Sequence, residues 1–384
     1  CGFSGTVRGR FESRPSRDRT ERRMTKKIYI TATRPGDGKT VVTLGLTARF
    51  RQTTEAIGFI KPLGKRPSGP SKRDPDVLLM EKVCGVDCDL SDMNPITVHT
   101  GFVEDFLRKK MTDQLIEQVQ ASFDRVAEGK DLVVIEGTGH AAVGSIFGLS
   151  NAYVASTLGA KVLIVTSGGL GPELDEITLN LAMFRNYGVD VLGVVLNRVG
   201  PEERDLLETV GKQALEDRGI PVLGIIPYRH MLESPSIREV LAATGGEVLN
   251  GEQEMENRVG KVVLGVSSPQ HALRELAPHS LLVTASDRAD LILTTISYRL
   301  LGEAEGSRVA GIVLCGDTHP DEEVLRLLRR TQLPVVLVDD ETYSTAARIR
   351  NFRGSISPND QGKIDLIQDL VARHVEADRI YDAL

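Results

Sequence analysis

The sequence predicts an α/β protein: a doubly wound parallel sheet followed by a second, smaller α/β unit. Three observations support this. Short runs of β-branched residues alternate with amphipathic stretches along most of the chain, which is the pattern of repeated βα units. The runs are almost continuously apolar, as in strands covered by helices on both faces. At 384 residues the chain is long for a single core, so two domains are expected.

Six strands are expected in the first domain, at residues 28–32, 56–62, 132–137, 161–167, 191–197 and 222–227. Apolar residues at helical spacing mark the helices between them, for example Ile116, Val119, Phe123 and Val126. The alternation resumes in the second unit, with strands expected at 262–266, 280–286, 309–316 and 334–340. Ligands of doubly wound sheets bind beyond the carboxyl ends of the strands, so the residues there are the candidates for a site.

A phosphate-binding loop follows the first strand. Gly38, Lys39 and Thr40 open a stretch of helical apolar spacing directly after a strand and a turn. In this context the backbone N–H groups of a P-loop bind phosphate, the lysine contacts the terminal phosphates and the hydroxyl ligates Mg²⁺. A strict Walker A motif has glycine where this chain has Thr33. The alternative is a strand-turn-helix that merely contains Gly-Lys-Thr.

Polar residues also mark the ends of other strands. Lys61 follows the second strand, Glu136 ends the third, Asn197 ends the fifth, and Asp76 lies in a polar loop before an apolar run. Asp76 and Glu136 are candidates for Mg²⁺, which prefers oxygen ligands, and Lys61 could neutralise charge on a transferred phosphoryl group. Singly, each has a structural alternative: Asp76 as a helix N-cap, Lys61 as a surface cation and Asn197 as a turn residue. Their joint placement favours a shared site.

Two further polar motifs have open roles. His140 follows Glu136 in a glycine-rich turn and could contact a ligand, although a lone histidine is more often structural. In the second unit, Asp287 and Arg288 either bind a ligand or cap the following helix and pair locally. The sequence alone favours the structural interpretation for all three residues.

The motifs ITATRPGDGKT, GFIKPLG, DPDVLLM, VVIEGTGH and VVLNRV resemble dethiobiotin synthetase and its relatives. The longer run EGTGHAAVGSIFGLSNAYVASTLGAKVLIVTSGGLG is more similar to the dethiobiotin-synthetase-like N-terminal domain of long phosphate acetyltransferases. The resemblance covers about residues 27–228. In the second unit, residues 285–290 (ASDRAD) resemble the signature of the DRTGG domain, with Ala289, Asp290 and Leu291 in place of Thr-Gly-Gly.

This resemblance implies a nucleotide site. The residues that would contact the nucleotide are Thr33, Gly36, Asp37, Gly38, Lys39, Thr40, Val41 and Asn197, the last of them at the base. Those near the metal would be Thr40, Asp76 and Glu136, and the catalytic residues would be Lys39 and Lys61. The loop residues Arg34, Pro35 and Asp37 differ from the synthetase loop, which receives a diamine, so they are where a different acceptor would bind.

The chain is expected to divide into four segments: a disordered, arginine-rich extension (1–23), a P-loop nucleotide-binding domain (24–228), a linker (229–257) and a DRTGG-like domain with a C-terminal helix (258–384). In the resembled acetyltransferases a catalytic domain follows the DRTGG region. None follows here before the sequence ends, so acetyl transfer by this chain alone is not expected.

We therefore expect ATP and Mg²⁺ as ligands and a function as a regulatory protein or slow ATPase. The alternative is a ligase of the dethiobiotin synthetase type, which would activate a carboxylate or carbamate by γ-phosphoryl transfer. A third hypothesis is an allosteric subunit of a separate acetyltransferase. The expected partners also include an unidentified small molecule and further copies of the chain.

Composition bears on location and partners. The four cysteines are too few and too scattered for a disulfide framework, which favours the cytoplasm. No apolar run approaches 18 residues, so no membrane span is expected. The chain has no tryptophan and few other aromatic residues, which argues against binding of single-stranded nucleic acid by base stacking.

Overall fold

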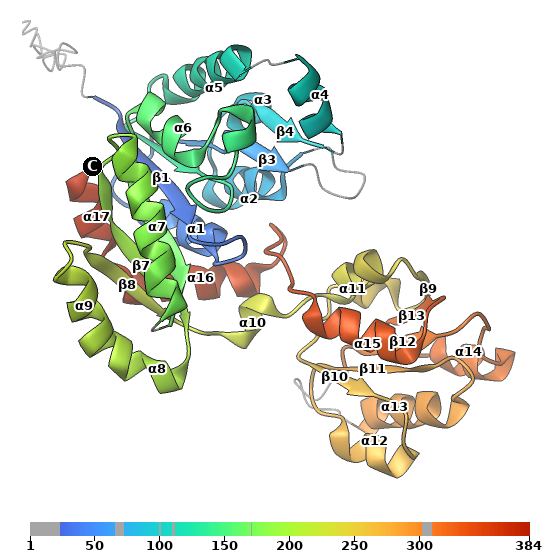
Figure 1. Cartoon of the computed structure of the whole chain (residues 1–384). Helices are drawn as coiled ribbons and strands as arrows, with labels where there is room; N and C mark the ends of the chain where they lie inside the picture. The colour runs from blue at the N-terminus through green and yellow to red at the C-terminus, as the bar shows by residue number, and fades with distance from the viewer. Residues whose placement is uncertain (1–23, 66–72, 100, 110–111, 170, 302–308) are drawn as a thin grey trace, which may run out of the picture.

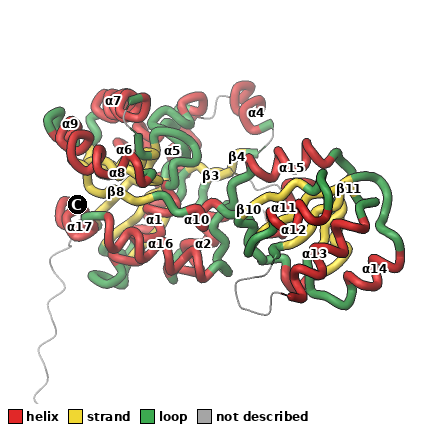
Figure 2. Tube along the Cα trace, turned by 90° about the horizontal axis from the view of Figure 1, so that it is seen from below, coloured by secondary structure: helices red, strands yellow, loops and turns green. Residues whose placement is uncertain are grey.

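The computed structural model describes residues 24–65, 73–99, 101–109, 112–169, 171–301 and 309–384, so the expected disorder of residues 1–23 lies outside the described residues. The described chain forms two α/β domains, which both views show side by side (Figures 1 and 2). Within these ranges, no helix is long and apolar enough to cross a membrane. The predicted fold class, a doubly wound parallel sheet with a second, smaller α/β domain, is confirmed.

The first domain is built on a parallel sheet of six strands. In spatial order they are β2 (Ile57–Ile60), β5 (Leu132–Glu136), β1 (Lys26–Ala32), β6 (Lys161–Ser167), β7 (Val191–Val199) and β8 (Val222–Pro227). The chain builds one half of the sheet on one side of β1 and the other half on the opposite side. The carboxyl end of β1 therefore lies at the point where strand order reverses, the usual ligand-binding position in such sheets.

Helices cover both faces of this sheet. One face packs against α5 (Thr112–Ala127), α6 (Asn151–Leu158) and α7 (Pro172–Asn186). The other packs against α1 (Lys39–Phe50), α2 (Pro75–Cys84), α16 (Gln361–His374) and α17 (Ala377–Ala383). Side chains of β1 alternate between the two cores, with Tyr29 in the first and Ile28 and Ile30 in the second. This alternation explains why the strand is apolar throughout.

Smaller elements complete the first domain. They are β3 (Leu63–Lys65) and β4 (Ile96–Val98), which pair in parallel, α3 (Leu90–Met93), α4 (Phe102–Lys109), the 3₁₀ turn η1 (Ser145–Phe147), α8 (Pro201–Leu206), the π-helical segment η2 (Leu207–Gly211), α9 (Lys212–Glu216) and α10 (His230–Glu233). Of these, α10 matters most for the site, because it leads from the first domain to the second.

The second domain has a mixed sheet of five strands. In spatial order they are β10 (Lys261–Leu264), β11 (Ser280–Ala285), β12 (Gly311–Cys315), β13 (Val335–Val338) and β9 (Glu247–Asn250), of which β9 is antiparallel to β13. One face packs against α11 (Ile237–Thr244) and α15 (Thr342–Asn351). The other packs against α12 (Pro269–Glu275), α13 (Ala289–Leu301) and α14 (Glu322–Leu328), and η3 (Glu252–Glu254) follows β9.

The expected linker at 229–257 contains folded parts of the second domain, and in this respect the prediction was wrong. Ser236 and Glu239 form a capping box that starts α11, and Gly245 ends the helix with φ +74°. The strand β9 then joins the second sheet. The glycines and Pro235 that suggested a linker are therefore the boundaries of short regular elements.

The C-terminal helix packs on the first domain, whereas the sequence placed it in the second. Ile364, Ile367 and Leu370 of α16 are buried in the same core as α1. Gly45 of α1 allows the close approach: a Cβ there would lie 2.3 Å from Val371 Cγ2. Helical periodicity shows that a face is apolar but not which domain covers it. The second domain is thus inserted between β8 and α16, and Figure 1 shows the red C-terminal helices back beside α1.

Candidate functional site

The P-loop between β1 and α1 takes a conformation that needs glycine. Gly36 and Gly38 have φ values of +92° and +90°, in the left-handed region. Gly38 is the N-cap of α1 and offers no side chain to the first turn. The first N–H groups of a helix have no partner within the helix, so this end of α1 can bind an anion. A Cβ on Gly38 would lie only 2.1 Å from Asn197 Nδ2, whereas one on Gly36 would meet no atom within 4 Å.

The Asp37 side chain stabilises the P-loop through hydrogen bonds. Its carboxylate is buried, with the residue 4% exposed. Oδ2 accepts hydrogen bonds from Thr33 Oγ1 (2.8 Å) and the Arg34 N–H (2.7 Å), and Oδ1 accepts one from Ser167 Oγ (2.8 Å). Thr33 Oγ1 also lies 2.7 Å from Thr166 Oγ1. Thr33 therefore has a structural role where a strict Walker A motif has glycine, and the Asp37 carboxylate is used within the loop.

Lys61 lies among three carboxylates. It is 7% exposed at the end of β2, and its Nζ forms ion pairs with Asp74 Oδ1 (2.9 Å), Asp76 Oδ2 and Glu136 Oε1 (3.7 Å). Burial lowers the pKa of Lys61, but Asp76, Glu136 and Asp74 together raise it above its ordinary value. Asp74 caps α2 by accepting a hydrogen bond from the Asp76 N–H (3.0 Å), so the cap that the sequence suggested for Asp76 belongs to Asp74. Lys61 is not a surface cation but a buried counter-ion.

Lys39 differs from Lys61 in its contacts within the described part of the chain. It is the first residue of α1, and none of the described residues forms a hydrogen bond or ion pair with its Nζ. Partial burial lowers the pKa of Lys39, and the negative charge of Glu136 opposes this shift. A partly buried cation at a helix N-terminus favours an anionic ligand.

Thr40, Asp76 and Glu136 bring three oxygen groups together. Thr40 Oγ1 lies 3.2 Å from Asp76 Oδ1 and 3.4 Å from Glu136 Oε1. Glu136 is 1% exposed, and its Oε2 has no hydrogen-bond partner in the described structure. Burial, and then the charge of Asp76, raises the pKa of Glu136. Burial would also raise the pKa of Asp76, but Lys61 holds it below its ordinary value.

This donor set fits a divalent cation that arrives with phosphate. No group of three or more His, Cys, Asp or Glu side chains in the described ranges could hold a metal by itself. Mg²⁺ bound with a nucleotide usually takes one or two carboxylates and completes its shell with phosphate oxygens and water. Two carboxylates beside a hydroxyl, with one buried carboxylate oxygen unpaired, satisfy this requirement.

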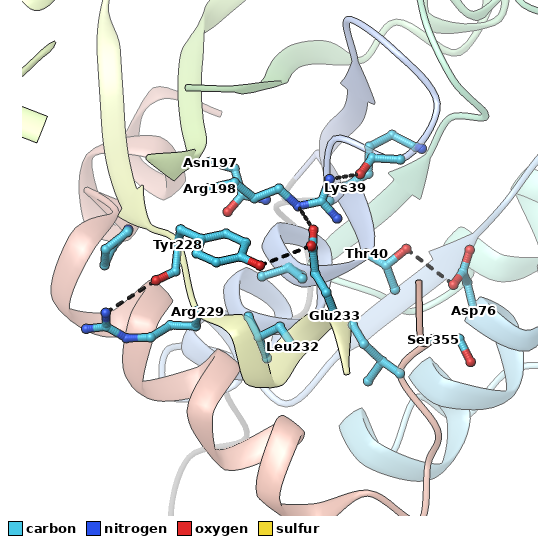
Figure 3. Close-up of a pocket in the computed structure, with 16 residues that line it drawn as sticks. Lys39, Thr40, Asp76, Asn197, Arg198, Tyr228, Arg229, Leu232, Glu233 and Ser355 are labelled. Carbon is cyan, nitrogen blue, oxygen red and sulfur yellow. Dashed lines mark hydrogen bonds and ion pairs between the residues drawn. The ribbon is translucent and has the colours of Figure 1, made fainter. Parts of the chain in front are cut away.

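A pocket of about 240 Å³ lies over the P-loop. Its floor includes Gly38, Lys39 and Thr40, and its walls come from the end of β7, from the segment after β8 and from residues 354–356. Figure 3 shows Arg198 and Tyr228 directed toward Glu233, and Thr40 beside Asp76. Of the sequence-predicted residues, Gly36, Val41, Asp76 and Asn197 also line the pocket, whereas Thr33, Asp37, Lys61 and Glu136 lie outside its lining.

Asn197 holds the P-loop. It is 3% exposed, and its Nδ2 donates to the Asp37 carbonyl oxygen across 2.8 Å. The next residue, Arg198, takes a left-handed conformation with φ +58°, donates to the Gly36 carbonyl and pairs with Glu233 at 2.9 Å. The contact of Asn197 with a base therefore stays a prediction, since its amide nitrogen is already engaged by the loop.

The sequence did not single out Arg198, Tyr228 or Glu233, although all three line the pocket. Arg198 and Tyr228 could have been found by applying the strand-end rule to β7 and β8, because each lies at or just beyond a carboxyl end. Glu233 has no comparable signal, since its position depends on the path of the chain into the second domain.

The remaining candidate residues lie outside this pocket. His140 accepts a hydrogen bond from the Ala142 N–H at its Nδ1 (3.3 Å), within its own turn. Arg288 pairs with Asp290 (2.8 Å) and donates to the Ser267 carbonyl (2.9 Å). These local contacts agree with the structural interpretation of His140 and Arg288.

Two parts of the chain match known protein families. Residues 26–236, more than half of the chain, match the family described as an AAA domain (AAA_26). The chain belongs to the AAA_26 family. The DRTGG domain matches residues 239–352. The predicted combination of a P-loop domain with a DRTGG domain is thus confirmed for this AAA_26 protein.

The curated relatives of this AAA_26 protein include phosphate acetyltransferases. It is 28% identical over 361 residues to the one from Nitrosomonas europaea, covering 91% of this chain and 50% of the relative. The values are 26% over 369 residues for Synechocystis sp. (94% and 52%) and 22% over 384 residues for Escherichia coli (93% and 52%). The chain therefore spans about half the length of the curated relatives it matches.

Some solved structures resemble the AAA_26 protein distantly. A ParA family ATPase from Chlorobium tepidum aligns with a TM-score of 0.35 at 16% identity, covering 54% of this chain and 87% of that one. The CBS and DRTGG domains of the regulatory region of Clostridium perfringens pyrophosphatase align with a TM-score of 0.26 at 12% identity, covering 38% and 69%.

Proposed function

We propose that this protein binds ATP with Mg²⁺ in the pocket over the P-loop and acts as a nucleotide-dependent regulatory protein or slow ATPase. The observation that carries this proposal is Lys39: its ammonium group lies at the N-terminus of α1 and has no partner among the described residues. A phosphate group would satisfy both the lysine and the first N–H groups of the helix.

The shape of the pocket indicates how a nucleotide would be oriented in it. With its phosphates at Lys39, the nucleoside would extend toward Asn197, Tyr228 and Glu233, which line the other side. Asn197 remains the candidate for base contact through its amide oxygen, because its nitrogen is bonded to the loop.

Thr40, Asp76 and Glu136 would hold the Mg²⁺ ion. When bound, Mg²⁺ would supply neutralisation of the charge on the phosphate oxygens. Lys61 keeps Asp76 ionised and therefore able to accept a cation. In this proposal Lys39 contacts the phosphates directly, and Lys61 acts mainly by balancing the carboxylates around it.

Slow hydrolysis is expected because of the state of Asp76, the carboxylate that lines the pocket beside Thr40. Asp76 is paired with Lys61, which holds the pKa of this carboxylate below its ordinary value. A carboxylate paired with a cation has a lowered proton affinity and is a poor general base for activating water. We therefore expect turnover well below that of a dedicated hydrolase.

Thermal unfolding tests the proposal. ATP with Mg²⁺ at about one hundred times its Kd adds about 2.7 kcal/mol to the free energy of unfolding, so the Tm of the native protein should rise. Lys39→Ala should abolish most of this rise, while Lys82→Ala, which removes an exposed lysine from α2, should keep it. An unchanged Tm in the native protein, or an equal rise in Lys39→Ala, would refute the proposal.

A synthetase of the dethiobiotin type is the second candidate. It is favoured by Arg34, which is exposed on the P-loop and pairs with Glu176 at 2.5 Å, where an acceptor could approach the terminal phosphate. Such an enzyme would release phosphate only with a second substrate. A screen of small carboxylic acids and amines for stimulated phosphate release distinguishes the candidates, because a regulatory protein would give the same low rate with each.

We also propose that the protein works in the cytoplasm as a homo-oligomer and regulates a phosphate acetyltransferase. Support comes from the acetyltransferase relatives, of which the chain spans about half. Affinity purification from the native cells tests this. If the amount of acetyltransferase recovered increases with the ATP concentration, the proposal is supported. If repeated purifications recover no acetyltransferase, it is contradicted.

A further inference from the structure

The chain crosses between the two domains twice, and both crossings line the pocket over the P-loop. We name residues 228–236 the outgoing connector and residues 352–360 the return connector. Tyr228 and Glu233 line the pocket from the outgoing connector, and Gly354, Ser355 and Ile356 line it from the return connector. In Figure 1 the segment through α10 leaves the first domain, and the red segment after α15 returns beside it.

The two connectors are packed closely against each other. The Gly354 N–H donates to the Glu233 carbonyl oxygen across 2.8 Å. A Cβ on Gly354 would lie 2.6 Å from the Ser234 carbonyl oxygen, so no larger residue fits without a shift of the backbone. A displacement of one connector therefore displaces the other.

Arg198 joins this pair of connectors to the P-loop. Its guanidinium donates to the Gly36 carbonyl oxygen and pairs through Nε with Glu233 Oε1 at 2.9 Å. The same Glu233 oxygen lies 3.6 Å from Arg353 Nη1. Figure 3 shows Glu233 between Arg198 and the ring of Tyr228. An unbroken series of contacts thus runs from the P-loop through Arg198 and Glu233 to both connectors.

Residues from both domains hold the return connector. Lys363 of α16 is fully buried, and its Nζ donates to the carbonyl oxygens of Ser234 (3.0 Å) and Ser355 (2.9 Å). Glu239 of α11 accepts hydrogen bonds from the N–H (2.7 Å) and Oγ (2.6 Å) of Ser355. Ser355 is therefore fixed between a helix of the first domain and a helix of the second, at the edge of the pocket.

We propose that a nucleotide bound at the P-loop stabilises the packed arrangement of the two connectors. In this way it would restrict movement of the second domain relative to the first. The proposal rests on the proposed function, since it requires ATP in this pocket. Arg198 has five N–H donors and uses its Nε and Nη1 atoms for Glu233 and Gly36, so Nη2 can bind phosphate while both existing contacts persist. The nucleotide then adds contacts to the connectors without breaking those already present.

Thermodynamic linkage makes the effect reciprocal. If ATP binding shifts the equilibrium toward packed connectors, then a change that disrupts their packing must lower the affinity for ATP by the same coupling free energy. A ligand of the second domain that changes the connectors would alter ATP affinity in the same way. The ATP affinity of the P-loop pocket would thus depend on the ligand state of the second domain.

Hydrogen exchange of the full chain provides the first test. With ATP and Mg²⁺, we expect peptides that cover residues 352–360, including the bonded N–H groups of Gly354 and Ser355, to exchange about five-fold more slowly or more. Peptides from β12, inside the second domain, should not change. Calorimetry on the same samples records ATP binding separately. Binding without slower exchange at 352–360 overturns this inference alone, whereas no binding overturns the proposed function with it.

The second test uses Lys363→Met, which removes the ammonium between the connectors but no residue that lines the pocket. We expect ATP to bind about five-fold more weakly, with less protection at 352–360. Lys261→Met is the matched control, because Lys261 Nζ pairs with Glu275 in the second domain and, among the described residues, forms no hydrogen bond or ion pair with either connector. Equal ATP affinity in the two variants would overturn the inference. If Lys363→Met does not fold, the exchange experiment on the native chain decides.

Discussion

Asn197 at the end of β7 donates its side-chain amide to the backbone carbonyl of Asp37, 2.8 Å away in the P-loop. The two residues are 160 positions apart in the sequence, and both are almost fully buried. The loop is therefore held by the neighbouring half of the sheet as well as by its own hydrogen bonds. A phosphate site preformed in this way does not have to be ordered when the ligand binds, which favours affinity.

Replacing Asn197 should weaken both the fold and nucleotide binding. Asn197→Ala leaves the buried Asp37 carbonyl without its donor, which costs about 1–3 kcal/mol of stability, and ATP affinity should fall because the loop is no longer held. Asn197→Asp should be worse, since it places a carboxylate opposite a carbonyl oxygen. Chemical unfolding and calorimetry measure the two effects. Asn186→Ala, at an exposed site on α7, is the control, and an unaltered Kd in Asn197→Ala would contradict this account of the loop.

Gly36 and Gly38 form a matched pair for testing the loop. Both have φ near +90°, so replacement by alanine causes similar backbone strain, about 1–2 kcal/mol at each. Only at Gly38 would the new Cβ collide with Asn197 Nδ2. We expect Gly38→Ala to lose ATP binding and Gly36→Ala to keep most of it. Equal losses in the two variants would mean that strain, and not the contact with Asn197, governs the loop.

Removal of Mg²⁺ should reveal the role of Thr40. Its hydroxyl lies within 3.4 Å of both proposed carboxylate ligands. Thr40→Ser keeps the hydroxyl, whereas Thr40→Val keeps the shape and loses it. With EDTA the two variants should bind ATP equally weakly, and with Mg²⁺ only Thr40→Ser should recover tight binding. The same response to Mg²⁺ in both would exclude the hydroxyl as a metal ligand.

The stability of the protein should depend on pH through Lys363. Burial, and secondarily Arg258, lowers its pKa to about 8, against about 10.4 in an unfolded chain. Between these values the unfolded state binds more protons, so stability rises with pH. Relative to Lys363→Met, the native protein should gain about 2.4 kcal/mol from pH 8 to pH 10.4 and nothing below pH 7. Parallel profiles of unfolding free energy against pH for the native protein and Lys363→Met would contradict the prediction.

The contact between α1 and α16 offers a test of how the C-terminus packs. Gly45→Ala places a methyl group 2.3 Å from Val371 Cγ2, and overpacking of this kind costs about 1–3 kcal/mol. Val371→Ala removes Cγ1 and Cγ2 but keeps Cβ, which would lie 2.5 Å from the new methyl group, so the double variant should regain only part of the stability lost by Gly45→Ala. Urea unfolding of the four proteins measures the interaction. Purely additive losses would mean that the two residues do not touch in solution.

The sequence predicted much of the first domain because its strands are buried on both faces. Such strands are apolar throughout, and the six expected strands correspond to the six strands of the sheet. The proximity of Thr40, Lys61, Asp76 and Glu136 was also predictable, because parallel strands end at one edge of a sheet. The functions assigned to these residues remain predictions.

Features that depend on the return path of the chain were not predictable. The strand β9 is short and only partly buried, so it lacks an apolar run, and its glycine-rich surroundings suggested a linker. The apolar face of α16 could have packed on either domain. The contacts of Glu233 with Arg198 and Gly354 require both crossings of the chain at once, and no local pattern encodes them.

The return of α16 and α17 to the first domain changes what counts as a separable piece of this protein. A fragment cut after residue 236 would expose the face of α1 at Gly45 and Phe50, which contact Val371 and Tyr381, and would be prone to aggregate. The smaller unit that keeps its core is discontinuous: residues 24–234 joined by a short bridge to residues 355–384. The hydrogen bond between Glu233 and Gly354 shows that the two cut ends already lie within bridging distance. Excision of the middle, and not truncation of the end, is therefore the way to isolate the P-loop domain.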